Sequence, residues 1–142
     1  MEKMEQIGKA VLDYRFYPED DKYTDGAIED EMLEIARNCA PEQYERVIVE
    51  KKSWPILYHF SYLRENIIRW LPMDGSENVL EIGAGPGAIT GALCEKGRQV
   101  TVIDLSKKRC LINAYRHKDC DNLHFLVGNF QDIEPKLTEQ YD

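Results

Sequence analysis

The segment V-L-E-I-G-A-G-P-G-A at residues 79–88 decides the fold of this chain. It is an apolar run of strand type that passes directly into three alternating glycines, Gly83, Gly85 and Gly87. Glycine lacks a Cβ, so this backbone can turn sharply and lie against a ligand at a distance that any side chain would block. The segment that follows is expected to be a helix, whose first N–H groups attract polar or anionic groups. The pattern therefore indicates a strand, a loop and a helix that together hold a nucleotide-like cofactor.

Two cofactor classes fit this loop, and Glu81 separates them. Read as G-x-G-x-x-G/A, residues 83–88 match the fingerprint of dinucleotide-binding folds, with Ala88 in the last place. Glu81 puts a carboxylate two residues before the first glycine, at the carboxyl end of the strand. A carboxylate there repels a pyrophosphate and attracts a cationic amino group, such as that of a methionine moiety. The residues thus favour S-adenosylmethionine (SAM) over a nicotinamide cofactor.

The same stretch, extended to residue 90, resembles motif I of the class I SAM-dependent methyltransferases, the E/D-x-G-x-G-x-G pattern. The resemblance implies a Rossmann-like, doubly wound sheet and SAM as the cofactor, held by Glu81, Gly83, Ala84, Gly85 and Gly87. Residues 80–90 also look like the ribosomal RNA adenine dimethylases. The Gln-Asn-Phe-Leu segment that precedes the first strand in those enzymes is absent here.

A second strand, rich in β-branched residues, is expected at residues 99–104 and ends in Asp104. A carboxylate at this point of a βαβ unit accepts hydrogen bonds from ribose hydroxyls. The resemblance gives Asp104 that role toward the ribose of SAM, with Leu105 beside it in the cofactor site. The alternative is purely structural, because Asp104 could instead cap Ser106 and the helix after it.

A third strand is expected at residues 123–127, followed by a loop that the resemblance places at the adenine. The family usually carries an acidic residue in this loop, which accepts from the adenine amino group. Asn129 stands there in this chain, and its amide oxygen can still accept. Phe130 is either a contact to the adenine ring or a core residue. Asp132 is the alternative to Asn129, or a residue of a surface turn.

Residues 1–74 are expected to form a helical cap or arm, in which one helix is well defined by its apolar spacing. Its stripe consists of Ile56, Phe60, Leu63, Ile67 and Trp70/Leu71. Ser53 and Pro55 are typical of its start and Pro72 of its end. Shorter helices are expected around residues 28–35 and 44–48, whereas residues 13–25 look irregular or loosely attached. The resemblance implies that this cap covers the cofactor and builds the pocket for the methyl acceptor.

Four side chains of the cap are candidates for contact with a substrate or for a lid over it: Tyr58, His59, Tyr62 and Arg64. All four lie in a segment rich in aromatic residues. The structural alternative is that the tyrosines are half-buried packing residues, that Arg64 pairs with a surface acid and that His59 is a structural histidine. No catalytic residue is assigned, because the family often carries the base after the fourth strand or later.

Residues 75–142 are expected to be the first half of the SAM-binding domain, with three parallel strands in the order 3-2-1. In the family the fourth strand lies on the other side of the first. Residues 139–142 look like the start of that strand. We interpret the chain as the N-terminal portion of a longer methyltransferase. Its central strand would then have an unpaired edge, which predicts a homodimer or pairing with a strand of another chain.

Composition narrows the function further. The chain has 142 residues, within the size of one ordinary domain, and a net charge of −8. A phosphate backbone is bound mainly through basic side chains, so a nucleic acid is disfavoured as the acceptor. The four cysteines have no C-x-x-C pair and the three histidines share no ligand spacing with them, which predicts reduced thiols, a cytoplasmic protein and no metal site. No apolar run is long enough for a membrane span.

The sequence therefore predicts a SAM-dependent methyltransferase that acts on a small molecule or another acceptor that is not a nucleic acid. Two alternatives remain. An NAD-dependent oxidoreductase would use the same glycine loop and Asp104, and Glu81 is the feature against it. A non-catalytic SAM-binding or interaction fragment becomes the better interpretation if no sequence follows residue 142.

Overall fold

The fold is built on one five-stranded sheet, seen in a computed structural model that describes residues 2–142. The strands are β1 (Met4–Ile7), β2 (Ala10–Asp13), β3 (Asn78–Ile82), β4 (Gln99–Asp104) and β5 (Leu123–Val127). Their order in the sheet is β1-β2-β5-β4-β3. Strands β2, β5, β4 and β3 are parallel, and β1 runs antiparallel to β2. The predicted 3-2-1 arrangement of the three later strands is confirmed, as is the mostly parallel α/β class.

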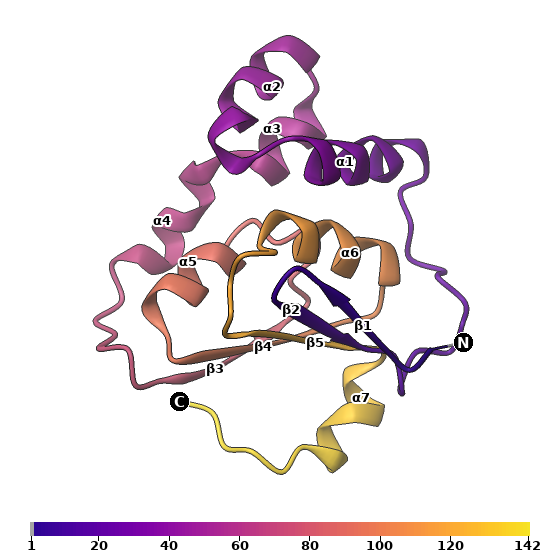
Figure 1. Ribbon diagram of the computed structural model, residues 1–142, viewed down its shortest axis with the longest axis vertical. Coiled ribbons are helices and arrows are strands. Elements are labelled where there is room, and N and C mark those ends of the chain that lie inside the picture. Colours follow the sequence, from indigo (N-terminus) through magenta and orange to yellow (C-terminus); the bar gives the residue numbers. More distant parts are fainter. Residues whose placement is uncertain (1) are drawn as a thin grey trace.

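The two crossover helices of this sheet lie on the same face, because right-handed βαβ connections that advance in one direction place their helices on one side. The α-helices are α1 (Ala27–Asn38), α2 (Tyr44–Lys51), α3 (Trp54–Phe60), α4 (Asn66–Arg69), α5 (Thr90–Lys96), α6 (Lys107–Arg116) and α7 (Phe130–Ile133). Three 3₁₀ turns are η1 (Pro41–Gln43), η2 (Tyr62–Glu65) and η3 (Glu134–Lys136). In Figure 1, α5 and α6 lie above the sheet, α7 lies below it, and α1, α2 and α3 form a further layer above α6. No helix in residues 2–142 is both long and apolar enough to cross a membrane.

The main hydrophobic core lies around the sheet, and β4 is the most buried of its strands. Val100 and Val102 of β4 and Phe125 of β5 are fully buried. A second core joins the upper helices to α6, with Met32 of α1, Ile56 of α3 and Ile112 of α6 in contact. The expected helices around residues 28–35 and 44–48 are confirmed as α1 and α2. These two cores place the cap directly on the helix that leads away from β4.

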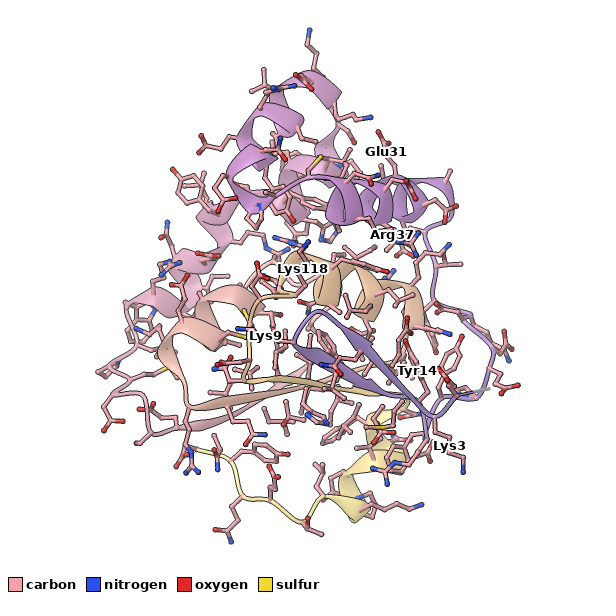
Figure 2. The ribbon with its side chains drawn as sticks, viewed as in Figure 1. Lys3, Lys9, Tyr14, Glu31, Arg37 and Lys118 are labelled. Carbon is pink, nitrogen blue, oxygen red and sulfur yellow. The ribbon has the colours of Figure 1, made fainter. Side chains whose placement is uncertain are left out.

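The first residues of the chain are not helical, which corrects the expectation of a cap that starts at residue 1. Strands β1 and β2 form a hairpin, and β2 pairs in parallel with β5 through Leu12 and Phe125. Lys9 N–H donates to the carbonyl of Lys118 over 2.7 Å, and Figure 2 shows these two residues close together beside the turn. Each strand has only four residues, too few for an alternating pattern to stand out in the sequence.

The long helix expected from residue 53 to residue 71 is wrong, because it breaks at Ser61. This residue has an extended backbone (φ −67°, ψ 132°), and its hydroxyl accepts from Leu63 N–H at 3.3 Å. The chain continues as η2 and α4 at a new angle. The apolar stripe is therefore buried only at Ile56 and Phe60, and Leu63 and Ile67 are exposed. A serine side chain that bonds the backbone two residues further on offers the chain an alternative to helix, which apolar spacing alone does not reveal.

Strand β3 is at an edge of the sheet within residues 2–142, because β4 is its one strand partner. On the side of β3 that faces away from β4, only the first residue, Asn78, is hydrogen-bonded within residues 2–142. Asp142 N–H donates to the carbonyl of Asn78 over 2.9 Å, and the Asp142 carboxylate accepts from Asn78 N–H, also at 2.9 Å. The backbone of Asp142 thus adds to the sheet where a fourth strand is expected.

We predict that this free edge makes the 142-residue chain self-associate. Unpaired N–H and C=O groups on a flat strand are a template for another strand, so the mass should rise from monomer to dimer as the concentration increases. Sedimentation velocity over a wide concentration range measures this. A single monomeric species at every concentration would contradict the prediction.

Candidate cofactor site

A cavity of about 310 Å³ opens where the parallel strands end. Ligands of open α/β sheets bind at this edge, because loops rather than helices cover the carboxyl ends of the strands. The lining comes from the ends of β3 and β4, from the loops that follow β3, β4 and β5, from α6 and α7, and from one residue of the N-terminal arm. The residues are Tyr23, Ile82, Gly83, Gly85, Ile103, Asp104, Leu105, Arg109, Gly128, Asn129 and Phe130.

The glycine loop after β3 forms one wall of this cavity. Gly83 and Gly85 have φ values of 71° and 57°, in the left-handed region that side chains rarely adopt. A Cβ added at either position would meet no protein atom within 4 Å, so the space beside them is open. At Gly87, in contrast, a Cβ would approach the Asn113 side chain to 2.2 Å. The first two glycines therefore leave room for a ligand, and the third allows α6 to pack against the loop.

Asp104, at the end of β4, connects this loop to the next helix. Its Oδ2 accepts from Gly85 N–H at 2.8 Å, and its Oδ1 accepts from Ser106 N–H at 2.9 Å. Ser106 in turn caps α6 by accepting from Arg109 N–H. The structural role weighed for Asp104 is thus present. Each carboxylate oxygen has a second lone pair, and the residue lines the cavity, so it can also accept from a ligand hydroxyl.

Glu81 lies outside the cavity lining and is buried beneath the loop, with 8% of its surface exposed. Its Oε1 accepts from the Thr90 hydroxyl at 2.5 Å. The Thr90 oxygen accepts from the Asn113 amide at 2.9 Å, and Asn113 Oδ1 lies 2.7 Å from Nδ1 of His117. Burial raises the pKa of Glu81 to about 7, which the bond from Thr90 partly opposes. A polar chain of four residues therefore runs from β3 through α5 into α6.

The loops after β4 and β5 bring three further predicted residues into the cavity: Leu105, Asn129 and Phe130. Asn129 is the N-cap of α7, and its Oδ1 accepts from Gln131 N–H at 2.9 Å. Phe130 is half-buried. Asp132, the alternative to Asn129, is exposed on α7 and does not line the cavity. Ala84 and Gly87 also stand outside the lining, within the same loop.

Five residues of the lining were not among the predicted site residues, and two of them, Tyr23 and Arg109, come from outside the predicted strand ends and loops. The arm before α1 carries Tyr23 to the cavity, because Asp21 Oδ2 accepts from the Ser106 hydroxyl and from Lys108 N–H, each at 3.0 Å. Arg109 Nε donates to Glu29, a buried residue of α1, at 2.6 Å. The sequence did contain an indication of the Arg109 contact. Three cations in the first turn of a helix oppose its dipole, so acids from elsewhere had to balance them.

None of the four cap candidates lines the cofactor cavity. Tyr58 lies between Trp54 and Arg64, with ring centroids 6.0 Å apart on one side and the guanidinium 4.2 Å from its ring on the other. His59 is half-buried, and burial lowers its pKa. Tyr62 lines a second cavity, which shares no lining residue with the first. The structure thus gathers Gly83, Gly85, Asp104, Leu105, Asn129 and Phe130 at one site and leaves the cap candidates apart from it.

The raised pKa of Glu81 predicts a pH-dependent stability. A carboxyl whose pKa rises from 4.5 to about 7 on folding stabilises the fold fully below pH 4.5, and this contribution is lost as the pH rises through 7. The substitution Glu81→Gln replaces it with a neutral group of the same shape. At about 1.4 kcal/mol per pKa unit, the variant should be more stable than the parent by about 3 kcal/mol at pH 8 and similar to it near pH 4.5. Urea unfolding at both pH values measures this, and an equal difference at both would contradict it.

Comparison with known proteins places this site in a family. Residues 79–142 match the family described as "Methyltransferase domain". An uncharacterized methyltransferase of Staphylococcus carnosus is 33% identical over 97 residues, covering 67% of this chain and 45% of that protein. Ribosomal RNA small subunit methyltransferase A of Pseudomonas putida is 32% identical over 84 residues, covering 59% of this chain and 30% of that enzyme. The chain thus spans less than half the length of these relatives.

Among solved structures, a match is phosphoethanolamine N-methyltransferase 1 of Haemonchus contortus, in complex with phosphoethanolamine and S-adenosylhomocysteine. Its TM-score is 0.47 at 22% identity, covering 68% of this chain and 22% of that one. The ribosomal RNA enzyme among the relatives does not support the expectation that the acceptor is not a nucleic acid. The family match covers β3, the glycine loop, Asp104 and the loop after β5. By this match, residues 79–142 of the chain belong to the methyltransferase domain family.

Proposed function

We propose that the cavity at the strand ends binds SAM and that the chain is the donor-binding part of a methyltransferase. One observation carries the proposal. The Asp104 carboxylate and the open backbone of Gly83 and Gly85 face the same cavity, so a hydroxyl-bearing ligand can be held at one end while it lies along the loop. These residues fit SAM, because Phe130 provides an apolar surface and Asn129 provides an amide at the other end of the cavity.

Each residue of the site would hold a different part of the cofactor. Asp104 would accept from the ribose hydroxyls, and Asn129 with Phe130 would contact the adenine. When bound, SAM supplies an electrophilic methyl carbon attached to a cationic sulfur. The protein then contributes mainly position and the exclusion of water. Glu81 would act from beneath the loop, where its ionised form adds a negative charge near the positively charged part of the cofactor.

The first test of this proposal is a calorimetric titration of the chain with SAM, with NAD as the competing cofactor. Asp104→Ala should weaken SAM binding by about tenfold or more, because it removes an acceptor of ribose hydroxyls and the anchor of Gly85. Asp132→Ala is the matched control, since this exposed acid lies outside the cavity and its loss should leave the affinity unchanged. Heat with NAD alone would favour the oxidoreductase, and no heat with either cofactor would contradict the proposal.

For the acceptor, we propose a small molecule or another group that is not a nucleic acid. The net charge of −8 opposes a polyanion. In the densest run of cations, residues 107–109, the side chains of Lys108 and Arg109 are already engaged by acids of the same chain. Lys108 Nζ contacts Asp30 at 2.6 Å, and Arg109 contacts Glu29 and Asp25 at 2.6 and 3.2 Å. These side chains are therefore not a free surface for phosphates.

A filter-binding assay with a short RNA stem-loop at low salt tests the acceptor class. We expect no saturable binding by the wild-type chain. The variant Asp30→Asn releases Lys108 and serves as the control for sensitivity, because it should bind the RNA more strongly than the parent. Tight binding by the parent that weakens steeply with added salt would overturn the proposal and favour an RNA methyltransferase.

A further inference from the structure

A second cavity, of about 670 Å³, lies between the cap and the outer sides of α5 and α6. It shares no lining residue with the cofactor cavity. Its size is within the range of small-molecule sites. The walls include five apolar side chains from α2, α3 and η2, namely Ile48, Val49, Leu57, Phe60 and Leu63. Val49 and Leu63 are 70% and 58% exposed, so much of this apolar surface is open to water.

A buried cation, Arg116 at the end of α6, also lines this cavity. Only 8% of its surface is exposed. Both of its hydrogen bonds run from Nη1, to the carbonyls of His59 at 2.7 Å and Pro86 at 2.9 Å. Its guanidinium lies 4.6 Å from the ring centre of Phe60. The side chain is therefore held by carbonyl oxygens and an aromatic ring rather than by a carboxylate.

No carboxylate of residues 2–142 forms an ion pair with Arg116. Its Nε is buried and has no hydrogen-bond partner. Glu65, an acid of the cavity wall, is engaged by Arg69 through Oε2 at 2.5 Å. Burial lowers the pKa of Arg116 to about 10, so the side chain remains charged at neutral pH. A buried charge without a counter-ion is costly, and an anionic group in the cavity would reduce that cost.

The hydroxyl of Tyr44 is a second buried group without a partner in this cavity. The residue is 7% exposed, and its ring meets Phe60 edge-on with centroids 4.9 Å apart. The Tyr44 ring also lies 5.6 Å from the Arg116 guanidinium. A phenolic O–H and a guanidinium N–H are both donors. An acceptor group that reaches this floor would satisfy both.

We propose that the second cavity binds a carboxylate attached to an apolar chain or ring. The carboxylate would lie toward Arg116 and Tyr44, and the apolar part would cover the exposed walls at Val49 and Leu63. Burial of such surface contributes about 25 cal/mol per Å². Five acids, Glu42, Glu45, Glu65, Glu95 and Asp119, also line the cavity. They disfavour a phosphate ester or another multiply charged anion, and a single carboxylate is the charge that Arg116 can balance.

Decanoate is a suitable probe, measured by calorimetric titration of the intact chain below its micelle concentration. We expect saturable binding of one decanoate per chain. Decyltrimethylammonium has the same tail and the opposite charge, and it should not bind. Tyr44→Phe keeps the ring and should weaken decanoate binding, because it removes one donor from the floor.

Two exposed residues provide a matched pair of variants. Leu63→Glu places a like charge on the cavity wall and should weaken decanoate binding by about tenfold or more. Ile67→Glu makes the same change at a residue that is 63% exposed and lies outside the cavity, so it should leave binding unchanged. Thermal unfolding followed by circular dichroism confirms that each variant is folded.

Three outcomes would overturn this proposal: no binding of decanoate to the folded chain, equal binding of the ammonium probe, or an equal loss in both glutamate variants. The proposal does not depend on the cofactor. A parallel titration with SAM reports on the first cavity alone, so the failure of one site is distinguishable from the failure of the other.

Discussion

The contact on which the cofactor site depends is the pair of hydrogen bonds that the Asp104 carboxylate accepts from Gly85 and Ser106. Through them one side chain fixes the loop after β3 and the start of α6. The backbone adds two parallel bonds, since Gly83 N–H donates to the carbonyl of Ile103 and Gly128 N–H to that of Asp104. The three loops around the cavity are thus held by the end of β4. The site at this edge of the sheet is therefore formed before a ligand binds.

Polar groups also cross the interior between the sheet and its helices. Glu81, Thr90, Asn113 and His117 form a continuous line of contacts, in which burial holds the pKa of His117 near 3 and that of Glu81 near 7. In a protein interior each of these groups would be costly without its neighbour. The line explains why α5 and α6 have a defined position against the loop, beyond what apolar packing alone would specify.

The sequence predicted those parts of the site in which backbone geometry and chemistry coincide. The turning glycines and the carboxylate at the end of β4 follow from local rules, the amide after β5 follows from the resemblance to the family, and Gly83, Gly85, Asp104 and Asn129 meet in one cavity. It did not predict Tyr23 or Arg109, whose places depend on hydrogen bonds and an ion pair between segments far apart in the chain. Nor did it predict the break at Ser61 or the short hairpin, because a single hydroxyl contact and four-residue strands leave no periodic signal.

The hairpin of β1 and β2 has a consequence for how the chain folds. A two-stranded hairpin is marginally stable by itself in water, and β2 gains its second neighbour through residues 11–13 and 124–126. During synthesis the first strands therefore have no stable place until nearly all of the described chain has been made. Bringing β2 and β5 together closes a long loop, and the entropic cost of this closure comes before the pairing of the two strands stabilises the fold. Folding is therefore slower than in a fold with local contacts. Strands β1 and β2 are thus synthesised before the other strands of the sheet and are among the last to find their places in it.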